Sequence, residues 1–219
     1  MSGFPGSPRL LKGAIISLDK FNPQSSVVVF QYNPDTMTRS LSPRTPKAEK
    51  KEDKPSPKEA LRITGPPEET ISIKIEIDAT DQLEMANPIA VELGIHPQLA
   101  ALEMLLYPKL TTVLSNQALT KTGTIEVIPM ELPLALFVWG NKRTLPVRLE
   151  SLSIEEQAFD VNLNPIRAEI SLSLRVLSYS DLQFGSKGSS LFLAHQVQKE
   201  LLAATTSALN AISQGTGII

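Results

Sequence analysis

Several residue types that support common chemistries are scarce or missing from this chain. Cysteine is absent from the 219 residues, which excludes disulfides and thiolate catalysis within the chain and fits a reducing compartment. Aromatic residues make up 5% of the sequence, and there are two histidines. The sequence holds no glycine-rich phosphate loop and no G-x-S-x-G elbow. The net charge of -2 argues against a surface built throughout to hold nucleic acid.

Long apolar runs are also missing. No stretch approaches the roughly 18 consecutive apolar residues of a membrane span, and residues 1–9 lack the apolar core of a secretory signal. We therefore expect a chain that folds in the cytoplasm without direct membrane insertion. Its length and its 42% hydrophobic content suggest one domain with appendages. We divide it into a β-domain over residues 1–182 and a flexible joint with a C-terminal helix over residues 183–219.

The clearest pattern is strict alternation of apolar and polar residues over residues 166–176, which predicts a half-buried β-strand. Residues 71–77 alternate in the same way, with isoleucine at every second position, and predict a second strand. Residues 10–18 and 26–32 are rich in β-branched and aromatic residues and are joined by turn chemistry, so we expect them to form a hairpin. Residues 122–129 predict a further short strand.

Turn residues predict how the long strands connect. Gly140 and Asn141 can take the positive φ angles of a two-residue hairpin turn, so residues 134–139 should fold back onto a strand that begins near Arg143. Between Leu149 and Leu152 the apolar phase shifts by one residue, which predicts a β-bulge near residues 150–151.

Residues 39–62 form a different kind of segment, rich in proline, lysine and glutamate and poor in apolar residues. We expect a long charged loop over residues 36–66 that is mobile or becomes ordered on a partner. A solvated extension, a docking element for another protein and, with least weight, a nucleic-acid contact are the alternatives for it.

Two helices are predicted. His96 and Pro97 open the first, its apolar residues are Leu99, Leu102, Leu105 and Leu106, and Pro108 ends it, so it should cover an open face of the sheet. The second spans residues 191–212, with a narrow stripe of mostly small residues suited to a neighbouring helix, a neighbouring subunit or its own sheet.

Candidates for catalysis or metal binding are few. His96 and His195 have no partner at ligand spacing, and we expect structural roles for both. Asp78, Asp81 and Glu84 lack the glycine and spacing of an EF-hand loop, so turn and cap hydrogen bonds are favoured over a cation site. Glu155, Glu156 and Asp160 could in principle supply a carboxylate pair of the glycosidase type, but adjacent Glu155 and Glu156 point to opposite faces of a strand and cannot share a site. We predict no enzymatic activity, no metal and no cofactor. Trp139 at a strand end is interpreted as a core or hairpin aromatic rather than a ligand platform.

Five segments together resemble the tube and tube-initiator proteins of contractile injection systems, which are phage-tail-like particles that include the antifeeding-prophage and virulence-cassette types. These segments are VVFQYNPDTM (28–37), PPEETISIKIEIDATDQLE (66–84), LAALEMLLYP (99–108), FVWG (137–140) and PVRLESLSIEEQAFDVNLNPIRAEISLSLRVLS (146–178). The resemblance covers roughly residues 10–181. Unlike many relatives beside the baseplate, the chain shows nothing similar to a LysM module after residue 181.

The resemblance implies a mainly β, α+β fold: a two-sheet antiparallel β-sandwich or barrel with one packed helix. It also implies a hexameric ring whose inner wall is a continuous β-barrel that lines the payload channel. The implied partners are further copies of the chain, inner tube proteins, the spike or hub protein and baseplate proteins. Assembly would take place in the cytoplasm of a bacterium, and the particle would be released or anchored through other components.

We prefer a tube initiator that joins hub and baseplate to the inner tube. The alternatives are the main inner-tube subunit, or a stand-alone β-barrel module that binds a carbohydrate or acidic polymer through Trp139 and the basic loop. The candidate contacts between subunits lie in the charged loop, the turn at residues 158–165 and the C-terminal helix. They are Arg44, Lys47, Lys50, Lys51, Lys54, Phe159, Asn162, Asn164, Val197, Leu201, Ala204 and Ala208.

Overall fold

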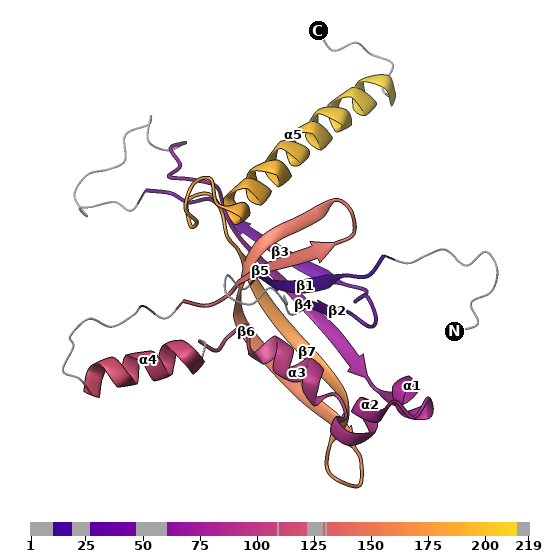
Figure 1. Cartoon of the computed structure of the whole chain (residues 1–219). Helices are drawn as coiled ribbons and strands as arrows, with labels where there is room; N and C mark the ends of the chain where they lie inside the picture. The colour runs from indigo at the N-terminus through magenta and orange to yellow at the C-terminus, as the bar shows by residue number, and fades with distance from the viewer. Residues whose placement is uncertain are drawn as a thin grey trace, which may run out of the picture.

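The computed structural model describes residues 11–18, 27–46, 61–108, 110–121, 129 and 131–213, with side chains described as far as residue 206. These residues form a mixed α/β chain of seven strands and five helices (Figure 1). The strands are β1 (Ala14–Leu18), β2 (Val27–Val29), β3 (Met37–Ser42), β4 (Glu68–Asp78), β5 (Leu134–Trp139), β6 (Arg143–Phe159) and β7 (Pro165–Val176). The helices are α1 (Thr80–Glu84), α2 (Pro88–Leu93), α3 (His96–Glu103), α4 (Leu110–Lys121) and α5 (Lys187–Ser213).

All the described strands belong to one antiparallel sheet, in the order β2-β1-β5-β6-β7-β4-β3. The expectation of two packed sheets or a closed barrel is therefore corrected, because β2 and β3 lie at opposite edges of the described sheet and do not pair with each other. The tight β5–β6 hairpin is the physical reason. It keeps β5 hydrogen-bonded to β6, so the β1–β2 pair continues the sheet instead of starting a second one.

The sheet is strongly curled rather than flat. The backbone N–H of Asp78, at the end of β4, donates a 2.9 Å hydrogen bond to the side chain of Gln31, which follows β2 near the opposite edge. Arg143 of β6 likewise reaches the sulfur of Met37 on β3 at 3.7 Å. One hydrophobic core therefore joins residues from both flanks of the sheet, including Ile15, Ile71 and Ile170.

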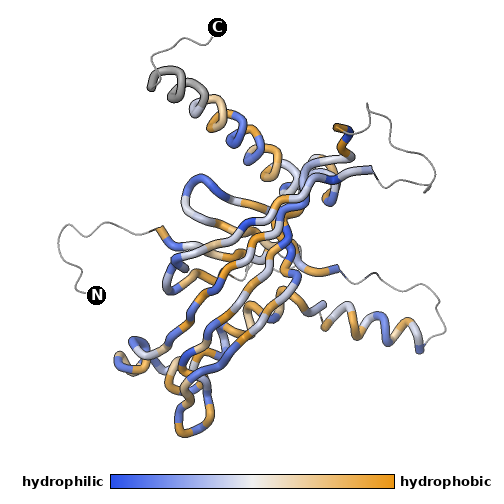
Figure 2. The backbone as a smooth tube through the Cα atoms, turned by 180° about the vertical axis from the view of Figure 1, so that it is seen from behind, coloured by the Kyte–Doolittle hydropathy of each residue, from blue (hydrophilic) through white to orange (hydrophobic). Residues whose placement is uncertain are grey.

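Alternation along the central strands creates this core, as predicted. The isoleucines of β4 face inward, and Ile71 is completely buried. On β7 Ile170 and Leu174 are completely buried, while the alternate residues Ser171 and Ser173 are partly exposed. Figure 2 shows the same alternation of hydrophobic and hydrophilic residues along the strands.

The predicted hairpins and bulge are largely confirmed. β1 pairs with β2, and β5 pairs with β6. The register between β6 and β7 shifts between Leu149 and Ser151, so Glu150 is the extra residue of the bulge. The β5–β6 turn has three residues instead of two, because Trp139 pairs with Arg143 and, of the two residues expected to have positive φ, only Gly140 does. The strand predicted at residues 122–129 lies outside the described residues except for its last position.

The charged loop is shorter than predicted at its start. Residues 37–42 form β3, which pairs with β4 along its whole length. This short alternating strand was not predicted because the segment that follows it is rich in charged residues. In the strand, Met37 packs against the core and Arg39 pairs with a carboxylate of β4. Residues 47–60 lie outside the described part.

The helices cover different parts of the sheet. α3 packs Leu99 and Leu102 into the core, and its regular part ends at Glu103, before the predicted end at Tyr107. α1 and α2 lie beside the far end of the β6–β7 hairpin, whereas α4 extends to one side (Figure 1). These three short or weakly amphipathic helices were not predicted. No helix of the described residues is long and apolar enough to cross a membrane.

α5 begins with its first turns against the sheet and then projects away from it (Figure 1). It starts at Lys187, earlier than predicted, so Gly188 of the expected joint lies inside the helix. There its backbone packs closely against Leu182.

Candidate functional site

The residues considered for catalysis do not form a site. Glu155 and Glu156 are neighbours on β6 and pair with Glu169 and Ala168 of β7, so their side chains point to opposite faces as expected. His96 is exposed at the start of α3. Within the described residues, no three His, Asp or Glu side chains come together in a way that could hold a metal ion.

Asp78 acts as a structural residue at the end of β4. Its carboxylate accepts hydrogen bonds from the backbone N–H and hydroxyl of Thr80, and it pairs with Arg167 of β7 at 2.6 Å. Burial alone raises the pKa of Asp78, but the hydrogen bonds from Thr80 and Arg167 outweigh it and lower the pKa. The turn hydrogen bonds favoured for this carboxylate are therefore present.

The turn between β6 and β7 is held together by Asp160. Its Oδ1 accepts hydrogen bonds from the backbone N–H groups of Asn162 and Asn164, each at 2.8 Å, and its Oδ2 accepts one from the side chain of Asn164. The hydrogen bonds from Asn164 and Asn162 lower the pKa of Asp160 below its ordinary value. The carboxylate is thus engaged in turn structure and not free for acid–base chemistry.

This turn presents apolar side chains to solvent. Val161 is 99% exposed and Leu163 is 77% exposed, while Phe159 beside them is half exposed. Of the candidate contacts placed here, Asn162 is exposed, but Asn164 also donates to the carbonyl oxygen of Glu92 in α2. An ordered turn with exposed apolar residues is suited to contact another protein.

α1 and α2 enlarge this apolar end of the molecule. Met85 is 72% exposed and Ile89 is 61% exposed. Sequence reasoning missed them because the segment was interpreted as a polar connection. The signal was present in Asn87-Pro88, where the Asn87 side chain caps α2 by accepting from the N–H of Ile89.

Arg44, the first candidate of the charged loop, is engaged within the chain. Its guanidinium pairs with Asp181 at 2.8 Å and approaches Glu68 at 3.5 Å. The Asp181 carboxylate also accepts from the N–H and hydroxyl of Ser178. This arrangement ties both ends of the loop region to the turn before α5. Lys47, Lys50, Lys51 and Lys54 lie outside the described residues.

The predicted contact stripe of α5 faces solvent. Val197 is 56% exposed, Leu201 is 65% exposed and Ala204 is exposed, while the side chain of Ala208 lies outside the described part. A different face of the helix packs on the protein: Phe192 is buried and meets Tyr179 edge-on at 5.9 Å. The stripe is therefore not used for packing α5 onto its own sheet.

A charged cluster joins β3, β4 and α5. Glu69 is almost fully buried and accepts from Arg39 at 2.7 Å and from Lys199 at 3.3 Å. His195, one helical turn before Lys199, is also buried. Burial, followed by the nearby Lys199, lowers the pKa of His195. Sequence reasoning treated His195 as isolated, because its neighbours come from distant strands.

Trp139 packs as a core aromatic, as interpreted from the sequence. Its ring stacks on Phe137 at 5.9 Å and lies 6.4 Å from Phe30. It therefore belongs to the edge of the core.

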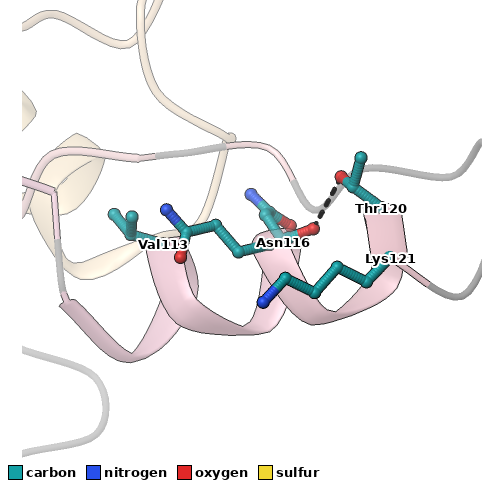
Figure 3. Close-up of a pocket in the computed structure, with 5 residues that line it drawn as sticks. Val113, Asn116, Thr120 and Lys121 are labelled. Atoms are coloured by element: carbon teal, nitrogen blue, oxygen red, sulfur yellow. Dashed lines mark hydrogen bonds between the residues drawn. The ribbon is translucent and has the colours of Figure 1, made fainter.

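One pocket of the described residues lies along α4 (Figure 3). Its described lining residues all come from this helix, and the Thr120 hydroxyl already donates to the backbone carbonyl of Asn116 at 2.8 Å. A single helix face of this kind does not bring together residues from several elements, so we assign no site to it.

The two edges of the sheet complete the candidate surfaces. On β2, Val27 and Val29 are each 53% exposed, and on β3 Leu41 is 49% exposed. Edge strands carry unpaired backbone groups, and apolar edges favour pairing with another chain.

Within the described residues, the two outer sheet edges, the apolar end and the stripe on α5 are exposed, which is typical of proteins that build assemblies. The chain belongs to the family of contractile injection system tube proteins, whose family model matches residues 10–183. A search of curated proteins found no match. Family membership makes the chain a structural tube-type component of a phage-tail-like particle. This structural role is consistent with the prediction that the protein is not an enzyme.

Proposed function

We propose that six copies of this chain form a ring that joins the spike hub and baseplate to the inner tube and lines the payload channel. The observation that carries the ring is the open sheet, in which no other described strand pairs with the outer edge of β2 or of β3. In a ring, β3 of each subunit would pair with β2 of the next subunit, so both edges of every sheet would be covered. The same closure would hide Val27, Val29 and Leu41.

The ends of the molecule support stacking of such rings. The turn at residues 160–164 exposes Val161 and Leu163, and α1 and α2 beside this end of the hairpin (Figure 1) are accompanied by the exposed Met85 and Ile89. In the proposed assembly these side chains contact the adjacent ring. Lys47, Lys50, Lys51 and Lys54 of the charged loop are proposed to reach a neighbouring ring or baseplate protein.

α5 supports a role at the start of the tube. The family match ends at residue 183, and α5 begins at Lys187, so this helix is additional to the tube-type region. A helix that projects from the sheet and exposes Val197 and Leu201 is suited to a special contact at one position in the particle. We therefore place this chain at the hub or baseplate end, with the joint at residues 183–186 connecting two functional parts.

Solution mass tests the ring. Light scattering over a concentration series should give about six times the 23.9 kDa chain mass, and negative-stain images should show closed rings. Val29→Lys and Leu41→Lys should each remove the ring by placing a charge at a proposed edge contact. Leu61→Lys is the matched control, because Leu61 is 93% exposed and lies outside the strands. Rings that persist in both edge variants would contradict edge pairing.

The number of copies of this chain per particle distinguishes a tube initiator from the main tube subunit. One ring per particle, measured by quantitative mass spectrometry against the sheath protein, is the result expected for an initiator. Tens of rings per particle would show that the chain builds the tube body.

The proposed role of the charged loop can be tested by a deletion that retains Arg44. A deletion of residues 44–56 also removes the pair between Arg44 and Asp181, so we propose deleting residues 47–56 instead. This variant should remain folded and fail to enter particles. Its recovery in full-length particles would remove the proposed role of the loop.

A further inference from the structure

A second, smaller pocket lies between α5 and the β5–β6 hairpin, outside the surfaces assigned above. Its volume is about 300 Å³, and it is lined by residues of α5, the β5–β6 hairpin and β3. This volume falls at the lower end of the roughly 300–1,000 Å³ that ligand pockets span. Unlike the pocket on α4, it brings together side chains that are far apart in the sequence.

The lining is strongly basic. Arg39, Lys142, Arg143 and Lys199 all contribute to it. Glu69 lies beside them, but its carboxylate already accepts from Arg39 and Lys199. None of the ion pairs among the described residues involves Lys142 or Arg143. Burial, followed by the nearby Arg39, lowers the pKa of Arg143, and the Glu69 carboxylate offsets this effect only in part.

His195 provides an independent sign of a ligand. Its side chain lines the pocket and is 9% exposed, and both ring nitrogens are buried without a hydrogen-bond partner in the described structure. Buried polar atoms are almost always satisfied, and an unpaired one costs about 1–3 kcal/mol. An acceptor placed in the pocket would satisfy a ring N–H.

Part of the pocket wall is apolar. The indole of Trp139 forms one part, and Leu202, which is 51% exposed, forms another. A small inorganic anion would use the cations but would leave these two surfaces uncovered. A ligand with an acidic group next to an apolar group matches the whole lining.

We infer that this pocket binds an acidic segment of another protein chain, with a carboxylate among Lys142, Arg143 and His195 and a neighbouring apolar side chain against Trp139 and Leu202. Charge-assisted hydrogen bonds to arginine and lysine supply orientation, and the apolar contact supplies selectivity. The site lies where residues 195–202, in the middle of α5, meet the β5–β6 hairpin.

Trp139 makes the proposal directly measurable, since it is the single tryptophan of the chain. The full-length protein is titrated with the peptide acetyl-Leu-Asp-Asp-Leu-amide while tryptophan emission is recorded. We expect a saturable change that weakens as salt is added. The isosteric peptide acetyl-Leu-Asn-Asn-Leu-amide should cause no saturable change.

Variants connect binding to the pocket. Lys142→Gln and Arg143→Gln should each weaken the acidic peptide about tenfold, because each removes a charge-assisted contact. Lys142 is exposed on the turn, so its variant should fold normally, which circular dichroism checks. Lys12→Gln removes an exposed positive charge elsewhere and should leave binding unchanged.

Three results would overturn the inference. Equal binding of the asparagine peptide would show that the carboxylate is not recognised. Unchanged binding in Lys142→Gln and Arg143→Gln would place the peptide elsewhere. Inorganic phosphate that changes Trp139 emission at the same concentrations as the peptide would identify a free-anion site instead. Because these measurements need no ring, their outcome is independent of the proposed assembly.

Discussion

The backbone N–H of Ile95 donates a 3.0 Å hydrogen bond to the carbonyl oxygen of Pro165. This bond ties the corner between α2 and α3 to the first residue of β7. The side chain of Asn164 strengthens the same connection by donating to the carbonyl of Glu92. The helices at this end and the exposed β6–β7 turn are therefore held as one unit.

Gly94 makes this close approach possible, and Gly94→Ala should destabilise the protein. Gly94 has φ +55° and ψ -132°, a region that is almost restricted to glycine, and an added Cβ would collide with the carbonyl oxygen of Pro165. We expect a loss of about 2–4 kcal/mol in the free energy of unfolding, measured by urea denaturation.

Gly140→Ala is the matched control for this substitution. Gly140 also has a positive φ, +63°, but an added Cβ would meet nothing within 4 Å. Only backbone strain remains, so the expected loss is about 1 kcal/mol. Equal losses in both variants would show that the contact with Pro165 contributes nothing beyond strain.

Ile170→Asp should prevent folding of the monomer. Ile170 is completely buried in the middle of β7, and an unpaired carboxylate there costs several kcal/mol, comparable with the whole stability of a typical domain. Circular dichroism should show loss of the β-sheet signal.

The adjacent variant Ser171→Asp tests whether position in the sheet is the cause. Ser171 faces away from the core and pairs with Lys74 of β4, so the new carboxylate lies opposite a positive charge. We expect stability within about 0.5 kcal/mol of the unchanged protein. A folded Ile170→Asp variant would contradict the assignment of the β7 core face.

Arg44→Ala should reduce stability by about 1–3 kcal/mol, because it leaves the Asp181 carboxylate with only the more distant Arg175 guanidinium, at 3.7 Å. Burial raises the pKa of Asp181, but hydrogen bonds from Ser178 and Arg44 outweigh it, so the folded-state pKa is lowered below the ordinary value of 3.8. The resulting stability is present above that value and lost as pH falls through the lower folded-state pKa.

Denaturation of Arg44→Ala at pH 7 and at pH 3 separates this ion pair from other effects. We expect the difference from the unchanged protein to be larger at pH 7 than at pH 3. Lys74→Ala is a suitable comparison, since Lys74 pairs with Glu169 on the exposed face and its replacement should cost less stability than Arg44→Ala. An equal deficit for Arg44→Ala at both pH values would exclude the charge interaction as its cause.

The sequence was sufficient for features set by local periodicity. Alternation located β4 and β7, and the phase shift at Glu150 located the bulge. The sequence was insufficient for features that depend on contacts between residues far apart in the chain. β3 depends on pairing with β4, and the basic pocket depends on Arg39 and His195 meeting across a curled sheet. The spacing of residues in the sequence does not predict such contacts.

Leu201→Glu should separate folding from assembly. Leu201 is 65% exposed on α5, so its replacement should change the free energy of unfolding by less than about 0.5 kcal/mol. In the proposed assembly a carboxylate in the exposed stripe would be buried without a partner, and binding to the hub or baseplate should be lost. Affinity purification of particles from cells carrying the variant measures this loss. Glu200→Gln, at an exposed position beside the stripe, should leave incorporation unchanged. Normal incorporation of Leu201→Glu into particles would exclude the stripe as a contact. The basic pocket beside residues 195–202 would then be the remaining proposed contact of α5.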